Sequence, residues 1–270
     1  MMRADIRGVG LWGPGLEGWA QGRAVLTEAA SFVPCPTDPP PPAILPANER
    51  RRAGPAARLA LTVAEEALAG SGIAPATLRA VFVSSSGEGA LVNSLLTTLA
   101  EPRAADQAIS PTLFHNSVHN EAAGYWSIAH ASRAPADSLA AHDASFANGL
   151  LKALAEITVE GEPVLFCLFD APMPFPLSAC RRTDFSFAMA LLLAPPALRA
   201  ACPLARLAGG FIPRPAPLTP PRLPALAALT AGNPAAQSLA LLEALARRET
   251  RRLTAPLFDG HLALEIAPEI

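Results

Sequence analysis

Residues 109–151 read ISPTLFHNSVHNEAAGYWSIAHASRAPADSLAAHDASFANGLL, and this stretch decides how the whole chain is interpreted. It contains four of the five histidines, at positions 115, 119, 130 and 142, among long apolar segments. Residues 118–130 are apolar on nearly all sides, which predicts a helix that is buried on most sides. A short strand at 139–141, a tight turn and a core-rich helix at 146–159 follow. We therefore expect any functional site of this chain to lie here.

The composition allows a sizeable core and excludes several classes of function. The chain has 270 residues, of which 51% are hydrophobic and 16% charged, with a net charge of −2. This balance gives no electrostatic reason to expect a nucleic-acid partner, and 6% aromatic residues argue against base stacking. No apolar run reaches the roughly 18 residues that a membrane span needs, and the N-terminus has no apolar signal segment. We expect a cytoplasmic protein.

The cysteines and histidines do not predict a metal site. The four cysteines show no CxxC spacing, so neither a zinc site nor a disulfide framework is expected. His115 and His119 are four residues apart, but HNSVH lacks the glutamate of an HExxH motif. The sequence implies no cofactor either. The cysteines are Cys35, Cys167, Cys180 and Cys202.

The rest of the chain alternates strand and helix patterns, which is typical of an α/β protein. Residues 33–46 are rich in proline and predict an extended surface loop. SSSGEG, at 84–89, follows a strand and could receive an anion, but without GxxxxGK or GxGxxG it better fits a tight turn. The expected strands cover 5–11, 81–84, 164–169, 185–193 (possibly antiparallel to its predecessor), 204–212 and 262–266, and the expected helices cover 55–69, 90–100 and 235–248.

Five segments together resemble the N-terminal half of β-ketoacyl synthases, the thiolase-like condensing enzymes. The resemblance spans roughly residues 3–195, and within that group the chain is most similar to short ketosynthase-like proteins encoded with aryl polyene-type clusters. Those proteins are regarded as chain-length-factor-like partners of a true ketosynthase. The segments are IRGVGLWGPG (6–15), NERRRAGPAARLAL (48–61), VFVSSSGEG (81–89), SPTLFHNSVHNEAAGYWSIA (110–129) and ASFANGLLKAL (144–154).

This resemblance implies an α/β thiolase-like fold made of a ketosynthase N-terminal half-fold and a short C-terminal extension. The implied division is a ketosynthase-like domain at 1–195 and an extension at 196–270 that packs on the same domain. Apolar strands and helices that the missing second half would cover need another cover, either the C-terminal segment or a second chain. Condensing enzymes dimerise through this region, with strands pairing across the interface.

The resemblance has a gap at the nucleophile. Active condensing enzymes place a cysteine in an A-C-x-S-type turn between a short strand and a buried helix, whose N-terminus favours the thiolate. Counting without gaps from Pro135 puts Asp143 at this position and Ser145 two residues later. A shift of two residues puts Ser145 there instead. Neither alignment places a thiol in the turn, although a carboxylate is electrostatically favourable at a helix N-terminus.

The catalytic histidines of the family are missing as well. They come from its second half, whereas only His261 follows residue 142 here, and the 75 residues from 196 to 270 are too few for a second half-fold. The resemblance therefore implies a noncatalytic subunit that forms a heterodimer with an active β-ketoacyl synthase. This subunit would bound the length of a growing polyene, polyketide or fatty-acid-like chain. An acyl carrier protein is the second expected partner.

Two other functions stay open: an acyl-transfer or thioester-hydrolysing enzyme that uses Ser145, and a structural assembly protein. No GxSxG motif supports the hydrolase, because the turn reads HDASFAN. We expect no catalytic residue, the turn at Asp143 and Ser145 being degenerate. Carrier-protein contacts are expected at Arg50, Arg51 and Arg52. The candidates for an acyl pocket or dimer interface are Phe114, His115, Asn116, His119, Asn120, Tyr125, Trp126 and Phe146.

Overall fold

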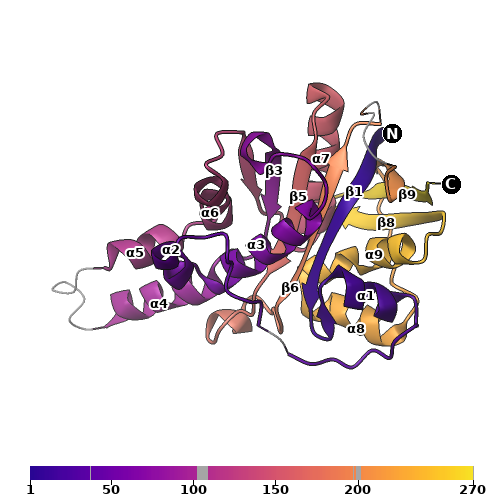
Figure 1. The fold of residues 1–270 in the computed structure, drawn as a ribbon. Helices are drawn as coiled ribbons and strands as arrows, with labels where there is room; N and C mark the ends of the chain where they lie inside the picture. Colours follow the sequence, from indigo (N-terminus) through magenta and orange to yellow (C-terminus); the bar gives the residue numbers. More distant parts are fainter. Residues whose placement is uncertain (37, 102–108, 197, 199–201, 270) are drawn as a thin grey trace.

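The computed structural model describes residues 1–36, 38–101, 109–196, 198 and 202–269. The described strands form one mixed sheet in the order β4-β3-β5-β6-β1-β7-β9-β8, and β2 (Leu16–Glu17) pairs with β1 (Figure 1). In the N-terminal part of this sheet β3, β4 and β5 are parallel, while β6 is antiparallel to both of its neighbours. These strands are β1 (Met2–Gly13), β3 (Arg79–Val83), β4 (Ala136–Leu139), β5 (Val164–Asp170) and β6 (Phe187–Ala194).

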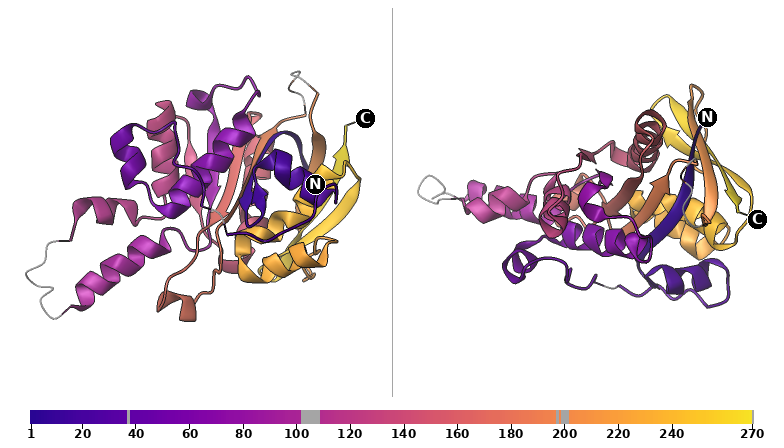
Figure 2. Two further views of the ribbon diagram at one scale, coloured as in Figure 1. Left: turned by 60° about the horizontal axis from the view of Figure 1, so that its bottom comes forward. Right: turned by 45° about the horizontal axis from the view of Figure 1, so that its top comes forward.

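The centre of the sheet is covered on both faces. Every residue of β5 and β6 is buried, as their uninterrupted apolar sequences predict for strands with helices on both sides. On one face pack α3 (Pro55–Leu68) and α6 (Glu121–His130), and on the other packs α7 (Ser145–Glu160) (Figure 2). Pro55 is the first residue of α3, where its missing N–H costs nothing. The predicted α/β class is confirmed.

Two helices extend from this body as an arm. They are α4 (Gly89–Ala100) and α5 (Pro111–Asn116), and they lie to the left of the sheet in Figure 1. None of the described helices is long and apolar enough to cross a membrane. Smaller elements complete the N-terminal part. The smaller elements are α1 (Trp19–Leu26), α2 (Ala47–Arg52), and the short 3-10 turns η1 (Pro75–Thr77), η3 (His142–Ala144) and η4 (Leu177–Ala179).

The C-terminal extension continues the same sheet. Strand β7 pairs antiparallel with β1, β9 with β7, and β8 with β9. These strands curve around α7, which contacts β7, β8 and β9 as well as β1, β3 and β5. The extension contains β7 (Ala205–Ile212), α8 (Pro224–Gly232), η5 (Pro234–Ser238), α9 (Leu239–Ala246), β8 (Arg251–Leu257) and β9 (Gly260–Pro268). The division of the chain into domains at residue 195 stays a prediction.

Within residues 109–151 the structure corrects the predicted boundaries of one helix and one strand. The predicted helix 118–130 begins at Glu121. Five of its ten residues are buried, whereas Gly124 is exposed and Ile128 is 50% exposed. Apolar residues on all sides of a helix do not reveal which side packs. The predicted strand 139–141 lies at 136–139 instead, where the polar residues Asp137 and Ser138 hid it.

Further predictions were wrong near the N-terminus, at α1, and in the C-terminal extension. The expected helix 235–248 is divided into η5 and α9, and β8 follows it where no strand was expected. Arg251, Arg252 and Pro256 gave β8 no strand pattern. Helices α1 and α8 were missed too, since their short alanine- and glycine-containing sequences show little amphipathic spacing.

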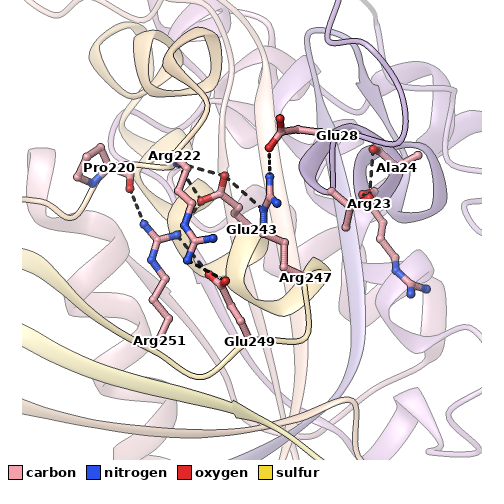
Figure 3. Close-up of polar contacts among 10 residues, drawn as sticks. Arg23, Ala24, Glu28, Pro220, Arg222, Glu243, Arg247, Glu249 and Arg251 are labelled. Atoms are coloured by element: carbon pink, nitrogen blue, oxygen red, sulfur yellow. Dashed lines mark hydrogen bonds and ion pairs between the residues drawn. The ribbon is translucent and has the colours of Figure 1, made fainter.

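A buried glutamate fastens the extension. Glu243, in α9, is fully buried, and its carboxylate lies 2.7 Å from Arg251 Nη1 and accepts two hydrogen bonds from the backbone N–H of Arg222 (Figure 3). Arg247 Nε lies 3.9 Å away and the Arg247 guanidinium also binds Glu28 near α1. One carboxylate thus joins α9, β8 and the segment before α8.

We expect Glu243→Gln to lower the free energy of unfolding by about 3 kcal/mol, because it removes one partner of a buried ion pair. Urea unfolding followed by circular dichroism measures the change. Glu265→Gln is the matched control, since Glu265 pairs with Arg252 at the surface and its loss should cost less than about 1 kcal/mol. Equal losses in both variants would show that Glu243 does not fasten the extension.

Candidate functional site

The turn that precedes α7 is strained and exposed. Chain direction reverses between Leu139, the end of β4, and Ser145, the first residue of α7, through η3. His142 has a φ of 52°, a left-handed conformation that costs energy for a residue with a Cβ. The side chains of His142 and Asp143 are 71% and 66% exposed. The turn therefore presents an imidazole and a carboxylate, and no thiol, at the helix N-terminus.

Arg181 closes over this turn from the loop between β5 and β6. Its Nη1 donates a 2.6 Å hydrogen bond to Asp143 Oδ1 and lies 3.0 Å from His142 Nε2. The ion pair neutralises the carboxylate that occupies the nucleophile position in the alignment counted from Pro135. Within the described residues the remaining guanidinium atoms, Nε and Nη2, are buried without a hydrogen-bond partner.

The hydroxyl of Ser145 is hydrogen-bonded to the backbone of the turn. The residue is fully buried, and its hydroxyl donates to the carbonyl of His142 at 2.7 Å and accepts from the N–H of Ala141 at 3.1 Å. A serine nucleophile needs a histidine within hydrogen-bond distance. The described contacts of the two candidate bases lie elsewhere: His142 contacts Arg181, and His119 Nε2 lies 3.0 Å from the carbonyl of Ser84.

Three of the predicted site residues form one hydrogen-bond network at the base of the arm. Asn116 donates to the carbonyl of Arg52 at 2.8 Å, and its Oδ1 accepts from the Tyr125 hydroxyl at 3.2 Å and lies 2.9 Å from His115 Nδ1. Burial raises the pKa of the Tyr125 hydroxyl. The network forms one wall of a pocket of about 470 Å³, which is lined by Glu49, Arg52, Pro111, Thr112, His115, Asn116, Tyr125 and Ile128.

The other predicted residues do not join this pocket. Trp126 and Phe146 are both buried but belong to the cores on opposite faces of the sheet. Phe114 is 62% exposed on α5, and Asn120 is exposed as the residue before α6. The assignment of all these residues to an acyl pocket or interface stays a prediction.

The arginine run before α3 is only partly available to a partner. Arg50 is tied down, because its Nη2 donates to the carbonyls of Ala43 and Leu45. Arg51 and Arg52 are exposed, and Arg52 lies 3.7 Å from Glu49. A carrier-protein contact at these arginines stays a prediction. In the described part of the chain no three His, Cys, Asp or Glu side chains are grouped to hold a metal ion.

The SSSGEG turn is held by a buried aspartate. Asp170 Oδ1, at the end of β5, accepts from the Ser84 hydroxyl at 2.8 Å and from the Ser85 N–H at 2.9 Å, and Gly87 N–H donates to the Ser84 hydroxyl. Burial raises the pKa of the Asp170 carboxyl to about 6. These N–H groups bond inside the protein, so the turn acts as an anchor for α4, as the tight-turn interpretation expects.

Two buried glutamates that the sequence did not single out lie where three helices begin. Glu88 precedes α4 and accepts from the N–H of Ala57, and Glu121 begins α6 and accepts from the N–H of Gly54, the residue before α3. The two buried carboxyls also interact with each other, and this interaction favours the protonated form of Glu121. Burial, followed by the charge of Glu88, raises the pKa of Glu121 to about 9. An acidic residue at a helix start was the only sequence signal for this pair.

We expect Glu121→Gln to stabilise the protein more at about pH 8 than at about pH 5. Because the folded-state pKa lies above the ordinary value of 4.5, the unfolded state loses its proton first as pH rises, and the free energy of unfolding falls between pH 4.5 and about 9. Glutamine remains neutral at both pH values. The difference between the two pH values should exceed about 1 kcal/mol in urea unfolding.

Glu162→Gln, an exposed glutamate in the turn after α7, provides the control. A pH dependence that is the same in wild type and in Glu121→Gln would mean that Glu121 is ionised in the folded protein.

Comparison with known proteins gives one family and one fold. The family model for the N-terminal domain of β-ketoacyl synthases matches residues 19–257. No curated protein matches the sequence significantly. A ketosynthase in complex with its chain length factor from Xenorhabdus doucetiae matches 98% of this chain and 100% of its own, with 22% identity and a TM-score of 0.71.

Two further solved structures give the same result. A complex of type II polyketide-synthase acyl carrier protein with its ketosynthase matches 99% of both chains with 12% identity and a TM-score of 0.75. A β-ketoacyl synthase from Burkholderia phymatum STM815 matches 100% of both chains with 15% identity and a TM-score of 0.68. At such identities the similarity establishes the fold alone.

Proposed function

The chain belongs to the β-ketoacyl synthase N-terminal domain family, and from that premise we propose that it is a noncatalytic, chain-length-factor-like subunit of a condensing complex. Its fold is the α/β thiolase-like half-fold with a short C-terminal extension. The observation that carries the proposal is the turn before α7, where a condensing enzyme needs a reactive thiol. Here Arg181 binds Asp143 and the backbone holds Ser145.

Neither Cys167 nor Cys180 is placed to replace the missing nucleophile. Cys167 lies inside β5, where burial raises its pKa far above the range in which a thiolate forms at neutral pH. Cys180 is exposed, but it belongs to the loop that carries Arg181 and not to a helix N-terminus. Chemistry by this chain alone is therefore disfavoured, and the hydrolase alternative loses its support because no histidine side chain among the described residues hydrogen-bonds the Ser145 hydroxyl.

The arm formed by α4 and α5 exposes apolar side chains, which favour a protein partner. Of the twelve residues of α4 only Gly89 is buried, the helix has no charged residue, and Leu96 and Leu99 are 48% and 54% exposed. Phe114 on α5 and Ile128 on α6 add exposed apolar surface. Apolar side chains gathered on an extension of a monomer mark a surface that another chain covers. A purely structural assembly role would use this surface too and remains the second candidate.

The exposed edge of the sheet supports the same partner. β4 is the terminal strand, so its outer backbone groups have no strand beside them among the described residues. An unpaired edge can accept a strand from another chain. Because condensing enzymes pair through this region, we propose that the partner is an active β-ketoacyl synthase and that the two form a heterodimer.

The solved structures make this partner chemically reasonable. One is a ketosynthase with its chain length factor, another is the ishigamide ketosynthase/chain length factor, and a third contains an acyl carrier protein. We carry these partners over as part of the proposal, since similarity of fold alone is an analogy. The pathway would be fatty-acid or polyketide biosynthesis, in the cytoplasm, with an aryl polyene as the proposed product class.

We expect Leu96→Glu to prevent the heterodimer, because a charge would have to be buried where a leucine is covered. Co-expression with a ketosynthase from the same organism, affinity purification of one subunit and light scattering measure the complex. Phe258→Glu is the matched control: Phe258 is 77% exposed in the β8–β9 turn, far from the arm, so the complex should form as in wild type. Loss of the complex in both variants, or in neither, would remove the arm from the interface.

We expect Phe114→Ala to leave the heterodimer intact and to change the length of the acyl product by one or more condensation cycles. A side chain that is 62% exposed on the arm would reach the partner's acyl tunnel, and its truncation would lengthen that tunnel. Mass spectrometry of carrier-bound products measures this. Unchanged product length in Phe114→Ala would favour the structural role.

Thioesterase activity of the purified chain that disappears in Ser145→Ala would favour the hydrolase.

A further inference from the structure

A second pocket lies where α1 meets the C-terminal extension. It has a volume of about 280 Å³, and none of its lining residues belongs to the arm or to the turn before α7. Side chains from α1, from the segment before β7, and from the ends of α9 and β9 form its walls. The lining residues are Trp19, Arg23, Cys202, Pro203, Leu204, Leu245, Arg248 and Glu269.

Two arginines of this pocket differ from the other arginines around it. The neighbouring guanidinium groups bind carboxylates: Arg247 binds Glu28, Arg222 binds Glu249 and Arg251 binds Glu243 (Figure 3). Arg206 binds Glu269.

Arg23, in contrast, has no carboxylate partner among the described residues, and its guanidinium points away from Glu28 (Figure 3). Among the described residues the Arg248 guanidinium binds only the backbone carbonyl of Glu269, at 3.3 Å. Both positive charges are therefore available to a ligand.

The pocket carries a net positive charge beside an apolar wall. The carboxylate of Glu269 is already neutralised by Arg206 at 2.7 Å, which leaves the charges of Arg23 and Arg248. Leu245 is 5% exposed, Trp19 is partly buried against the core, and Leu204 is 44% exposed. Guanidinium groups bind carboxylates in a directional manner, and the apolar wall favours a hydrocarbon chain attached to such a group.

We propose that this pocket binds a small carboxylate with a short alkyl chain. Arg23 and Arg248 hold the carboxylate, while Trp19, Leu204 and Leu245 contact the chain. The volume lies at the small end of ligand pockets, which run from about 300 to 1,000 Å³, so it suits a small molecule. This site is separate from the proposed partner surface and does not depend on it.

The probe for the test is sodium octanoate, titrated into the full-length chain while the indole N–H resonances are recorded. The Trp19 resonance, assigned by its loss in Trp19→Phe, should shift saturably with a dissociation constant of about 1 mM or tighter. Arg23→Gln and Arg248→Gln should each weaken binding by at least about tenfold, because each removes a charge-assisted hydrogen bond.

Matched ligands and a matched variant complete the experiment. Octanol, which lacks the charge, and butanoate, which lacks most of the chain, should both bind more weakly than octanoate. Arg252→Gln removes an exposed arginine elsewhere in the extension and should bind octanoate like wild type. The proposal is overturned if octanoate gives no saturable shift of Trp19, if octanol binds equally well, or if both arginine variants bind like wild type.

Discussion

Helix α7 has to be buried on more than one side, and the rest of the structure depends on how this is achieved. The helix carries nine buried residues and packs on β1, β3 and β5, but a single sheet covers only one side of a helix. Here β7, β9 and β8 continue the sheet beyond β1 and curve back onto α7. The Glu243 ion-pair network then fastens this cover to α1 and α9 (Figure 3). The hydrophobic effect thus explains how a half-fold closes with a short extension.

The turn before α7, on which the proposed noncatalytic role rests, contains no thiol. The N-terminus of α7 still follows a short parallel strand through a strained turn, but the turn is filled by His142, Asp143 and the guanidinium of Arg181. At the base of the arm the buried carboxyls of Glu88 and Glu121 join the N-termini of α3, α4 and α6 through hydrogen bonds to backbone N–H groups. The polar groups near the expected site therefore hold elements in place, and the exposed apolar residues of the arm face outward.

Much of the fold could be predicted from the sequence, because the deciding patterns are local. The continuous apolar runs of β5 and β6, the proline at the start of α3 and the buried Cys167 were all expected and are confirmed. The segments that resemble β-ketoacyl synthases gave the family, which is confirmed as well.

What could not be predicted depends on residues that are far apart in the chain. Arg181 meets Asp143 only because the loop after β5 returns to the turn 38 residues before it. Glu88 and Glu121 interact because three helices begin close together, and β8 forms as a strand because β9 pairs with it despite its arginines and proline. No local pattern contains these contacts.

The most direct test of the central claim is the intact mass of each subunit after a ketosynthase complex that contains this chain has received an acyl thioester. If the chain is a noncatalytic partner, the acyl mass appears on the ketosynthase subunit and the mass of this chain is unchanged. An acyl adduct on this chain, above all one that disappears in Ser145→Ala, would contradict the account.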